Sequence, residues 1–333
     1  MTKLVLTAVV AALVTVPSAW GTVPRSNSST GTARVFLPNP VADLQDESLT
    51  DQKDADYPAL QPAYHTLRLT NLDGSGFLCG DWACVYSETG KPAYSQTNTF
   101  SYNRHDDEFE QTMAYYWVTE AQKYIQSLGF GVWRRPVNME SQLLRINQLG
   151  YDNSFATDKP RTELRFGKGG VDDAEDAEVI LHEYGHAIHF SQNFDFGGEG
   201  GAISEGFGDY WAVTVSDHIS PTPDEPCVAD WDSVSYTSRV PHCLRRVDTS
   251  LHYPENLSGE VHHDGQIWSR ALWDIRGALG PTMADTIILQ GSFDFPGTTM
   301  TDLATRTVAA AQQLYGSGAA GKVRKAFQDR GIL

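Results

Sequence analysis

Hydrophobic and polar residues follow the period of an α-helix in several stretches of the chain. Residues 107–128 place Phe109, Met113, Trp117 and Ala121 three or four positions apart, which predicts a helix with one apolar face. The same kind of spacing predicts helices at residues 200–217, 263–277, 282–291, 300–315 and 320–330. Helices therefore dominate the C-terminal half of the chain.

Short apolar runs bounded by turn residues predict strands in the first half. Residues 57–100 are broken by Asn71, Asp73-Gly74 and Gly80, which is typical of a small β-rich module. Further strands are predicted at residues 132–133, 143–146 and 164–166, and a long loop region at residues 218–260. Strands followed by helices indicate an α+β fold, with a β-rich N-terminal lobe and a mainly helical C-terminal lobe.

The N-terminal residues predict export. Lys3 precedes the apolar run at residues 4–16, which is too short to span a bilayer, so residues 1–21 have the pattern of a signal peptide. Residues 22–56 are rich in Ser, Thr, Pro and acidic residues, and part of them is expected to form a loose arm. We therefore divide the chain into a signal peptide (1–21), an arm with a small β-rich module (22–93) and a main domain (94–333).

Composition narrows the possible partners. The 333 residues carry a formal net charge of −17, which argues against nucleic acid or an anionic membrane as partner. We expect a secreted, extracellular monomer that does not associate with membranes after signal removal. The four cysteines, an even number in an exported chain, favour disulfides. Three pairings are possible, and short loops favour the two local ones, Cys79–Cys84 and Cys227–Cys243.

The segment His182–His186 reads His-Glu-Tyr-Gly-His. On a helix, positions i and i+4 lie on one face about 6 Å apart along the axis, so both imidazoles can reach one metal ion. Glu183 follows the first histidine and can take a proton from a metal-activated water. His189 lies about 10 Å along the helix from His182, too far to share that metal. Gln192 stands where metzincin peptidases need a third histidine, which excludes that class.

Acidic residues precede the histidine motif and predict where its helix begins. Negative charge is favourable near a helix N-terminus because of the helix dipole. We therefore expect the following side chains to lie in the first turns of the helix: Asp172, Asp173, Glu175, Asp176 and Glu178.

Two histidines need a third ligand, and the downstream carboxylates are Asp195, Glu199, Glu205 and Asp209. Glu205 is the best candidate because it lies in the helix predicted at residues 200–217, with Asp209 one turn further on the same face. A metal-bound histidine needs its other ring nitrogen held by a carboxylate or carbonyl, a role that Asp209 can fill. We expect His182, His186 and Glu205 to bind one zinc ion per chain.

Taken together, these motifs resemble the gluzincin zinc metallopeptidases, in particular the thermolysin-type and fungalysin-type families. Further segments also resemble parts of these families: the glutamate helix at 201–205, the edge strand at 153–155 with 164–167, the fungalysin histidine segment at 261–268 and the C-terminal helices. The resemblance covers roughly residues 94–333. It implies a two-lobed thermolysin-like fold, with zinc in the cleft and residues 94–333 as the catalytic domain.

The resemblance also implies roles for individual residues. Glu183 would be the general base, and Asp209 would orient His182. His262 would stabilise the oxyanion of the tetrahedral intermediate, and Asn153 would hold the main chain of the substrate.

Some features of these families are open or missing. His263, or a loop tyrosine such as Tyr253, is an alternative to His262 as oxyanion donor. The second oxyanion donor of thermolysin, a tyrosine, has no match, since Gly197 stands at its expected position. The acidic calcium sites of thermolysin are not recognisable beyond Glu178, so calcium is possible but unsupported. Whether residues 22–93 act as a propeptide is also open.

The sequence thus predicts a secreted zinc-dependent endopeptidase that acts on protein or peptide substrates. A zinc aminopeptidase of the same fold is an alternative, but it would need an acidic anchor for the substrate amine, and no such motif is found. A non-catalytic zinc-binding extracellular protein is a second alternative, disfavoured because Glu183 and all expected ligands are present. The motifs do not predict a cleavage preference.

Overall fold

The computed structural model describes residues 28–87 and 90–333, so the predicted signal peptide lies outside the described residues. The helices are α1 (Pro40–Leu44), α2 (Glu108–Ser127), α3 (Ala177–Ser191), α4 (Gly200–Ile219), α5 (Val261–Leu279), α6 (Pro281–Ser292), α7 (Met300–Tyr315) and α8 (Ser317–Asp329). Three short 3-10 helices are η1 (Pro58–Ala63), η2 (Asp173–Glu175) and η3 (Asp232–Ser235). The strands are β1 (Ser29–Val35), β2 (His65–Leu72), β3 (Ala83–Ser87), β4 (Thr99–Phe100), β5 (Gln142–Leu149), β6 (Phe155–Thr157), β7 (Glu163–Gly167), β8 (Cys227–Val228) and β9 (Arg245–Arg246).

The larger sheet has the strand order β3-β5-β7-β6. Strands β3, β5 and β7 run parallel, and β6 pairs antiparallel with β7 at the edge of the sheet. Helices α2 and α3 pack against this sheet. An edge strand is expected at residues 153–155, but β6 begins only at Phe155, so the two ranges overlap at that one residue and Asn153 precedes the strand.

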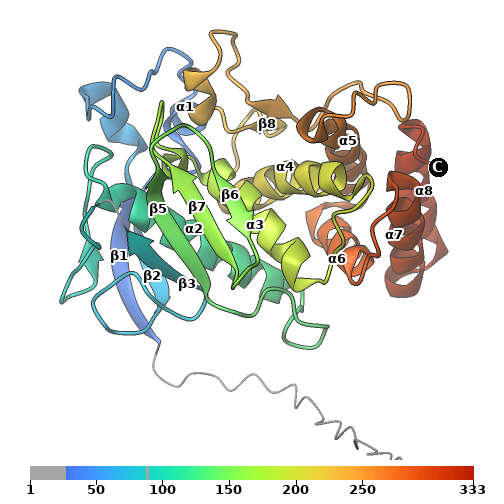
Figure 1. Cartoon of the computed structure of the whole chain (residues 1–333), viewed down its shortest axis with the longest axis horizontal. Helices are drawn as coiled ribbons and strands as arrows, with labels where there is room; N and C mark the ends of the chain where they lie inside the picture. The colour runs from blue at the N-terminus through green and yellow to red at the C-terminus, as the bar shows by residue number, and fades with distance from the viewer. Residues whose placement is uncertain (1–27, 88–89) are drawn as a thin grey trace, which may run out of the picture.

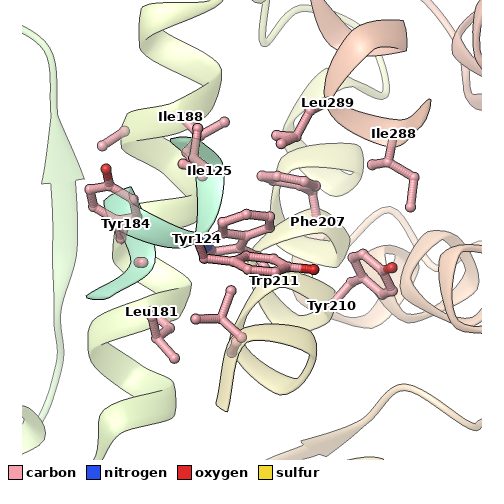
Figure 2. Close-up of a cluster of buried hydrophobic side chains, with 14 of the residues drawn as sticks. Tyr124, Ile125, Leu181, Tyr184, Ile188, Phe207, Tyr210, Trp211, Ile288 and Leu289 are labelled. Atoms are coloured by element: carbon pink, nitrogen blue, oxygen red, sulfur yellow. The ribbon is translucent and has the colours of Figure 1, made fainter. Parts of the chain in front are cut away.

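The C-terminal helices α5 to α8 gather on the side of the molecule away from the sheets, with α3 and α4 between the two parts (Figure 1). Large side chains from α2, α3, α4 and α6 meet in one buried cluster (Figure 2): Tyr124, Ile125, Leu181, Tyr184, Ile188, Phe207, Tyr210, Trp211, Ile288 and Leu289. Burying one such aliphatic or aromatic side chain contributes roughly 1.5–3 kcal/mol relative to leaving it exposed. The cluster therefore holds α3, which carries the histidine motif, firmly against α4.

The loose arm expected within residues 22–56 is not seen over its described part. Residues 29–35 form β1, which pairs antiparallel with β2 and parallel with β4, and Val35 and Phe36 are fully buried. The small polar residues of this strand concealed its alternation, and the long-range pairing decided its structure. The division at residues 93 and 94 stays a prediction, although residues from both sides of it belong to one hydrophobic cluster.

The strand predicted at residues 132–133 is wrong. Gly129 and Gly131 take positive φ values of 97° and 76° and turn the chain directly after α2. Trp133 donates its backbone N–H to Gly129 and leaves its side chain 71% exposed. Glycine tolerates this backbone geometry at no steric cost, so the apolar pair sits in a turn.

Both local disulfides predicted from the loop lengths are confirmed, Cys79–Cys84 and Cys227–Cys243. The second one joins Cys227, the first residue of β8, to Cys243, two residues before β9, and β8 and β9 pair antiparallel. Among the described residues, no helix is long and apolar enough to cross a membrane.

Candidate active site

The helices α3 and α4 approach each other closely because glycines face one another between them. A Cβ atom added at Gly208 would lie 2.8 Å from Cε1 of His182, and one added at Gly185 would lie 3.0 Å from Cα of Gly208. A side chain at Gly208 would force the ring of His182 to shift, and one at Gly185 would press tightly on the backbone of α4. This close approach brings Glu205 of α4 opposite the histidine pair of α3.

The three predicted zinc ligands come together. His182, His186 and Glu205 each offer a ligand atom, and these atoms all lie within 4.8 Å of one another. Nε2 of His182 lies 3.2 Å from Oε2 of Glu205, and Nε2 of His186 lies 3.6 Å from Oε1. His189 is not part of this group. It is buried, stacks on Phe194 and Phe207, and lies 3.0 Å from the hydroxyl of Ser204.

Both histidines have their other ring nitrogen held in place. Nδ1 of His182 donates to Asp209 at 2.9 Å, and Nδ1 of His186 lies 2.9 Å from the hydroxyl of Ser204. Asp209 in turn accepts two hydrogen bonds of 2.7 Å from Arg245. These contacts leave the Nε2 atoms free to face Glu205. Two imidazole nitrogens and one carboxylate are the donor set of catalytic zinc sites, so the residues present fit zinc.

Burial and neighbouring charges set the protonation of the carboxylates around this group. Burial raises the pKa of Glu183 to about 7, and its Oε2 atom is buried without a hydrogen-bond partner. Burial would also raise the pKa of Asp209, but the charge of Arg245 and the hydrogen bond from His182 hold it well below its usual range. Glu183 therefore keeps one carboxylate oxygen that no other described residue engages.

A cavity of about 430 Å³ opens at the histidine pair, and Asn153, Glu183 and His262 line it. Nε2 of His262 lies 3.5 Å from Oε2 of Glu205, and its Nδ1 contacts Glu260 at 2.7 Å. The proposed oxyanion donor and substrate-binding amide therefore border the same space as the proposed zinc ligands.

The two alternatives to His262 are engaged elsewhere. Nδ1 of His263 contacts Asp264 at 3.1 Å, and the hydroxyl of Tyr253 donates to Glu199 at 3.0 Å. Neither residue belongs to the described lining of the cavity. Of these three candidates, His262 is the one that lines the described cavity.

The acidic residues before α3 do not all lie in its first turns. Asp176 is the N-cap of the helix and accepts from the backbone N–H of Glu178 at 2.9 Å, as the dipole argument predicts. The earlier acids are instead buried among other side chains. Glu175, for example, forms an ion pair with Arg104 at 2.9 Å. These acids are buried because η2 packs against the core. The pattern of charges along the sequence does not predict such packing.

Three residues of the site escaped the sequence analysis. Arg245 and Tyr236 come from the loop region between α4 and α5 and line the cavity, and Ser204 supports His186. Arg245 lies 36 positions from its partner Asp209, and no motif spacing connects the two. Of the three, only Ser204 could have been suspected from the sequence, because it directly precedes Glu205.

Comparisons with known proteins agree with this arrangement. No protein-family model matches the chain. The chain is 26% identical over 203 residues to a gelatinase from Enterococcus faecalis, a match that covers 55% of this chain and 38% of that protein. The chain therefore spans well under half the length of the curated relative that it matches.

Among solved structures, the chain is similar to the precursor of protealysin, a metalloproteinase from Serratia proteamaculans. The TM-score is 0.55 at 16% sequence identity, and the match covers 79% of this chain and 92% of that one. The resemblance to metallopeptidases of this type is confirmed, and so is the α+β, two-lobed fold expected from it.

Proposed function

We propose that the chain is a secreted zinc-dependent endopeptidase. The observation that carries the proposal is the convergence of His182, His186 and Glu205 within 4.8 Å, beside a buried Glu183 with an unpartnered oxygen. When bound, zinc supplies a Lewis acid that polarises a carbonyl and lowers the pKa of water. His182, His186 and Glu205 would hold one such ion per chain.

The residues around this centre have distinct tasks. Glu183 accepts a proton from the attacking water and passes it to the leaving amine, as its unpartnered oxygen in the cavity permits. His262 donates a hydrogen bond to the carbonyl oxygen as it gains negative charge. The amide of Asn153 binds the main chain of the substrate. Asp209 is a positioning residue, because it touches His182 and not the space of the cavity.

Export and a protein or peptide substrate are also part of the proposal. The signal pattern at residues 1–21 and the gelatinase match support an extracellular enzyme that acts on proteins or peptides. The monomeric state stays a prediction.

Two measurements on the purified protein test the proposal. Elemental analysis should give one zinc per chain after reconstitution, and the loaded protein should cleave casein and peptides blocked at both ends. Glu183→Gln should keep zinc and fold while losing at least about 10²–10⁴-fold in kcat/KM, the usual contribution of general-base catalysis. Glu140→Gln, the same change at an exposed position, is the matched control and should leave activity unchanged.

The alternatives give different results in the same assays. An aminopeptidase would cleave only peptides with a free amino terminus. A non-catalytic zinc protein would bind one zinc and cleave nothing. Substoichiometric zinc after reconstitution, or an active Glu183→Gln variant, would refute the proposed mechanism.

A further inference from the structure

A second group of acidic side chains lies on the wall of the active-site cavity. Asp173 of η2 and Asp232 of η3 line the same cavity as His182 and Glu183. Together with Asp152, just before β6, they offer three carboxylate oxygens that all lie within 4.8 Å of one another. Three segments that are far apart in the sequence thus place carboxylates at one point beside the proposed zinc ligands.

Asp173 and Asp232 are buried and incompletely satisfied, whereas Asp152 is half-buried. Asp173 is 3% exposed and Asp232 is 4% exposed. Each has one carboxylate oxygen that is buried without a hydrogen-bond partner. Asp173 accepts from the hydroxyl of Ser154, and Asp152 accepts from that of Tyr236. The carboxylate of Asp232 accepts no hydrogen bond from any residue in the described part of the chain.

This group lacks an ion-pair partner within the part of the chain that the structure describes. Among residues 28–87 and 90–333, no lysine, arginine or histidine forms an ion pair with Asp152, Asp173 or Asp232. The charge of Arg245 acts on Asp232, but its guanidinium is already engaged by Asp209 through two hydrogen bonds of 2.7 Å. An isolated buried carboxylate is costly unless it is protonated or paired, so the group is prepared to receive a cation.

The cavity that holds these carboxylates also has apolar side chains in its lining. Val179, Val228 and Ala229 line the same cavity, and the last two are almost fully buried. Lysine and arginine side chains bury their aliphatic stems on such surfaces while the charged end reaches a polar group. A bare metal ion such as calcium would instead need six to eight oxygen ligands, which this partly apolar wall does not offer.

We propose that Asp173 and Asp232, with Asp152 behind them, form a specificity pocket for a lysine or arginine side chain of the substrate. The basic residue lies next to the cleaved bond, because the carboxylates share one cavity of about 430 Å³ with Glu183 and the zinc-binding group. This inference rests on the proposed peptidase function and names its substrate class: peptides cleaved beside a basic residue.

The test compares peptides that differ at a single position next to the cleaved bond. Lysine or arginine is exchanged there for norleucine, which keeps an unbranched aliphatic chain without the charge, and mass spectrometry of the products locates the cleavage. We expect kcat/KM of the zinc-loaded protein to be at least about 30-fold higher for the basic peptides, as for other buried charge pairs. Asp232→Asn should lower this ratio at least about tenfold, with little change for the norleucine peptide.

Asp172→Asn is the matched control. Asp172 is equally buried and adjoins Asp173, but it belongs to a different acidic group, with Asp107 and Glu110, and does not line the cavity. The same loss of a carboxylate there should leave the preference for basic residues unchanged.

Several outcomes would overturn the assignment. Equal cleavage of basic and norleucine peptides by the wild-type protein would do so while leaving the peptidase function intact, and this measurement needs no variant to fold. A thermal stabilisation by Ca²⁺ that Asp232→Asn abolishes would assign the carboxylates to a metal ion instead. Failure to cleave any peptide would refute the proposed function, and with it the inference that depends on it.

Discussion

One set of buried carboxylates precedes α3 and a second set follows it in α4. The pKa values of the two sets are shifted in opposite directions. Upstream, burial and the neighbouring charge of Glu175 raise the pKa of Asp172 to about 8, and burial raises that of Asp173 to about 7. Downstream, burial would raise the pKa of Glu205 too, but the hydrogen bond from His182 and the nearby His186 lower it to about 2. Asp209 is held lower still beside Arg245.

The difference shows that burial alone does not decide what a carboxylate can do. Both sets are largely removed from water, so the partners decide: imidazole and guanidinium groups downstream, mainly other carboxylates upstream. The downstream pair is therefore ionised and suited to hold a metal ion and its ligands. The upstream carboxylates are poised to be protonated. Asp172 has Lys168 at 3.8 Å, whereas Asp173 has no ion-pair partner among the described side chains and could take a cation from another molecule. Substitutions on each side of α3 test this difference.

Glu205→Gln should have the largest effect because it removes the charge of the proposed zinc ligand in the downstream set. Groups that only orient a zinc ligand are worth roughly 10–100-fold in metal affinity, so loss of a ligand should exceed about 100-fold and abolish measurable proteolysis. Zinc content by elemental analysis and kcat/KM on a blocked peptide would check this. Full retention of zinc by the variant would contradict the ligand assignment.

His262→Ala should lower kcat/KM by about 10²–10³-fold with zinc still bound, the usual effect of removing one oxyanion donor. His263→Ala is the control, since that side chain contacts Asp264 and lies outside the described lining of the cavity. Kinetics and zinc content of both variants decide the matter. A larger loss in His263→Ala with the fold intact would move the assignment by one residue.

Asp209→Asn should weaken zinc binding by roughly 10–100-fold without removing a ligand, because it disturbs the carboxylate that holds His182. Competition with a coloured chelator would measure the change in affinity. Unchanged affinity would mean that the ring of His182 is held by packing against Gly208 and not by Asp209.

Asp172→Asn should have the smallest effect, and it should be stabilising. The folded-state pKa of Asp172, about 8, lies above its ordinary value of 3.8, so the folded protein binds this proton more tightly than the unfolded one. Wild-type stability attributable to this group is full below 3.8 and is lost as pH rises towards about 8, whereas asparagine does not titrate.

The advantage of Asp172→Asn in free energy of unfolding should therefore grow by at least about 1 kcal/mol between pH 5.5 and 8. Urea unfolding of both proteins at the two pH values, with zinc present throughout, would measure it. An advantage that shrinks with rising pH would show that Lys168, 3.8 Å away, keeps Asp172 ionised in the folded state.

Short stretches of the sequence are enough to predict most helices, the histidine pair and both disulfides of this protein. Helical periodicity predicted α2 and α4 to α8 within a few residues, and the four-residue spacing of His182 and His186 placed both imidazoles on one face. Short loops predicted both disulfides. These features depend on neighbours in the chain, so a reading of residue types at short range is enough to find them.

The strand pairing, the long-range side-chain contacts and the protonation of the carboxylates depend on the tertiary structure. No sequence motif relates the residues that meet in three places. These are the pairing of β1 with β4, the hydrogen bonds from Arg245 to Asp209, and the cluster of Asp152, Asp173 and Asp232. The protonation of the carboxylates follows from these contacts as well, because desolvation and nearby charge act through space and not along the chain. One acidic side chain, Glu205, is thus a proposed zinc ligand, whereas others, Asp173 and Asp232, form part of an acidic group without an ion-pair partner among the described residues.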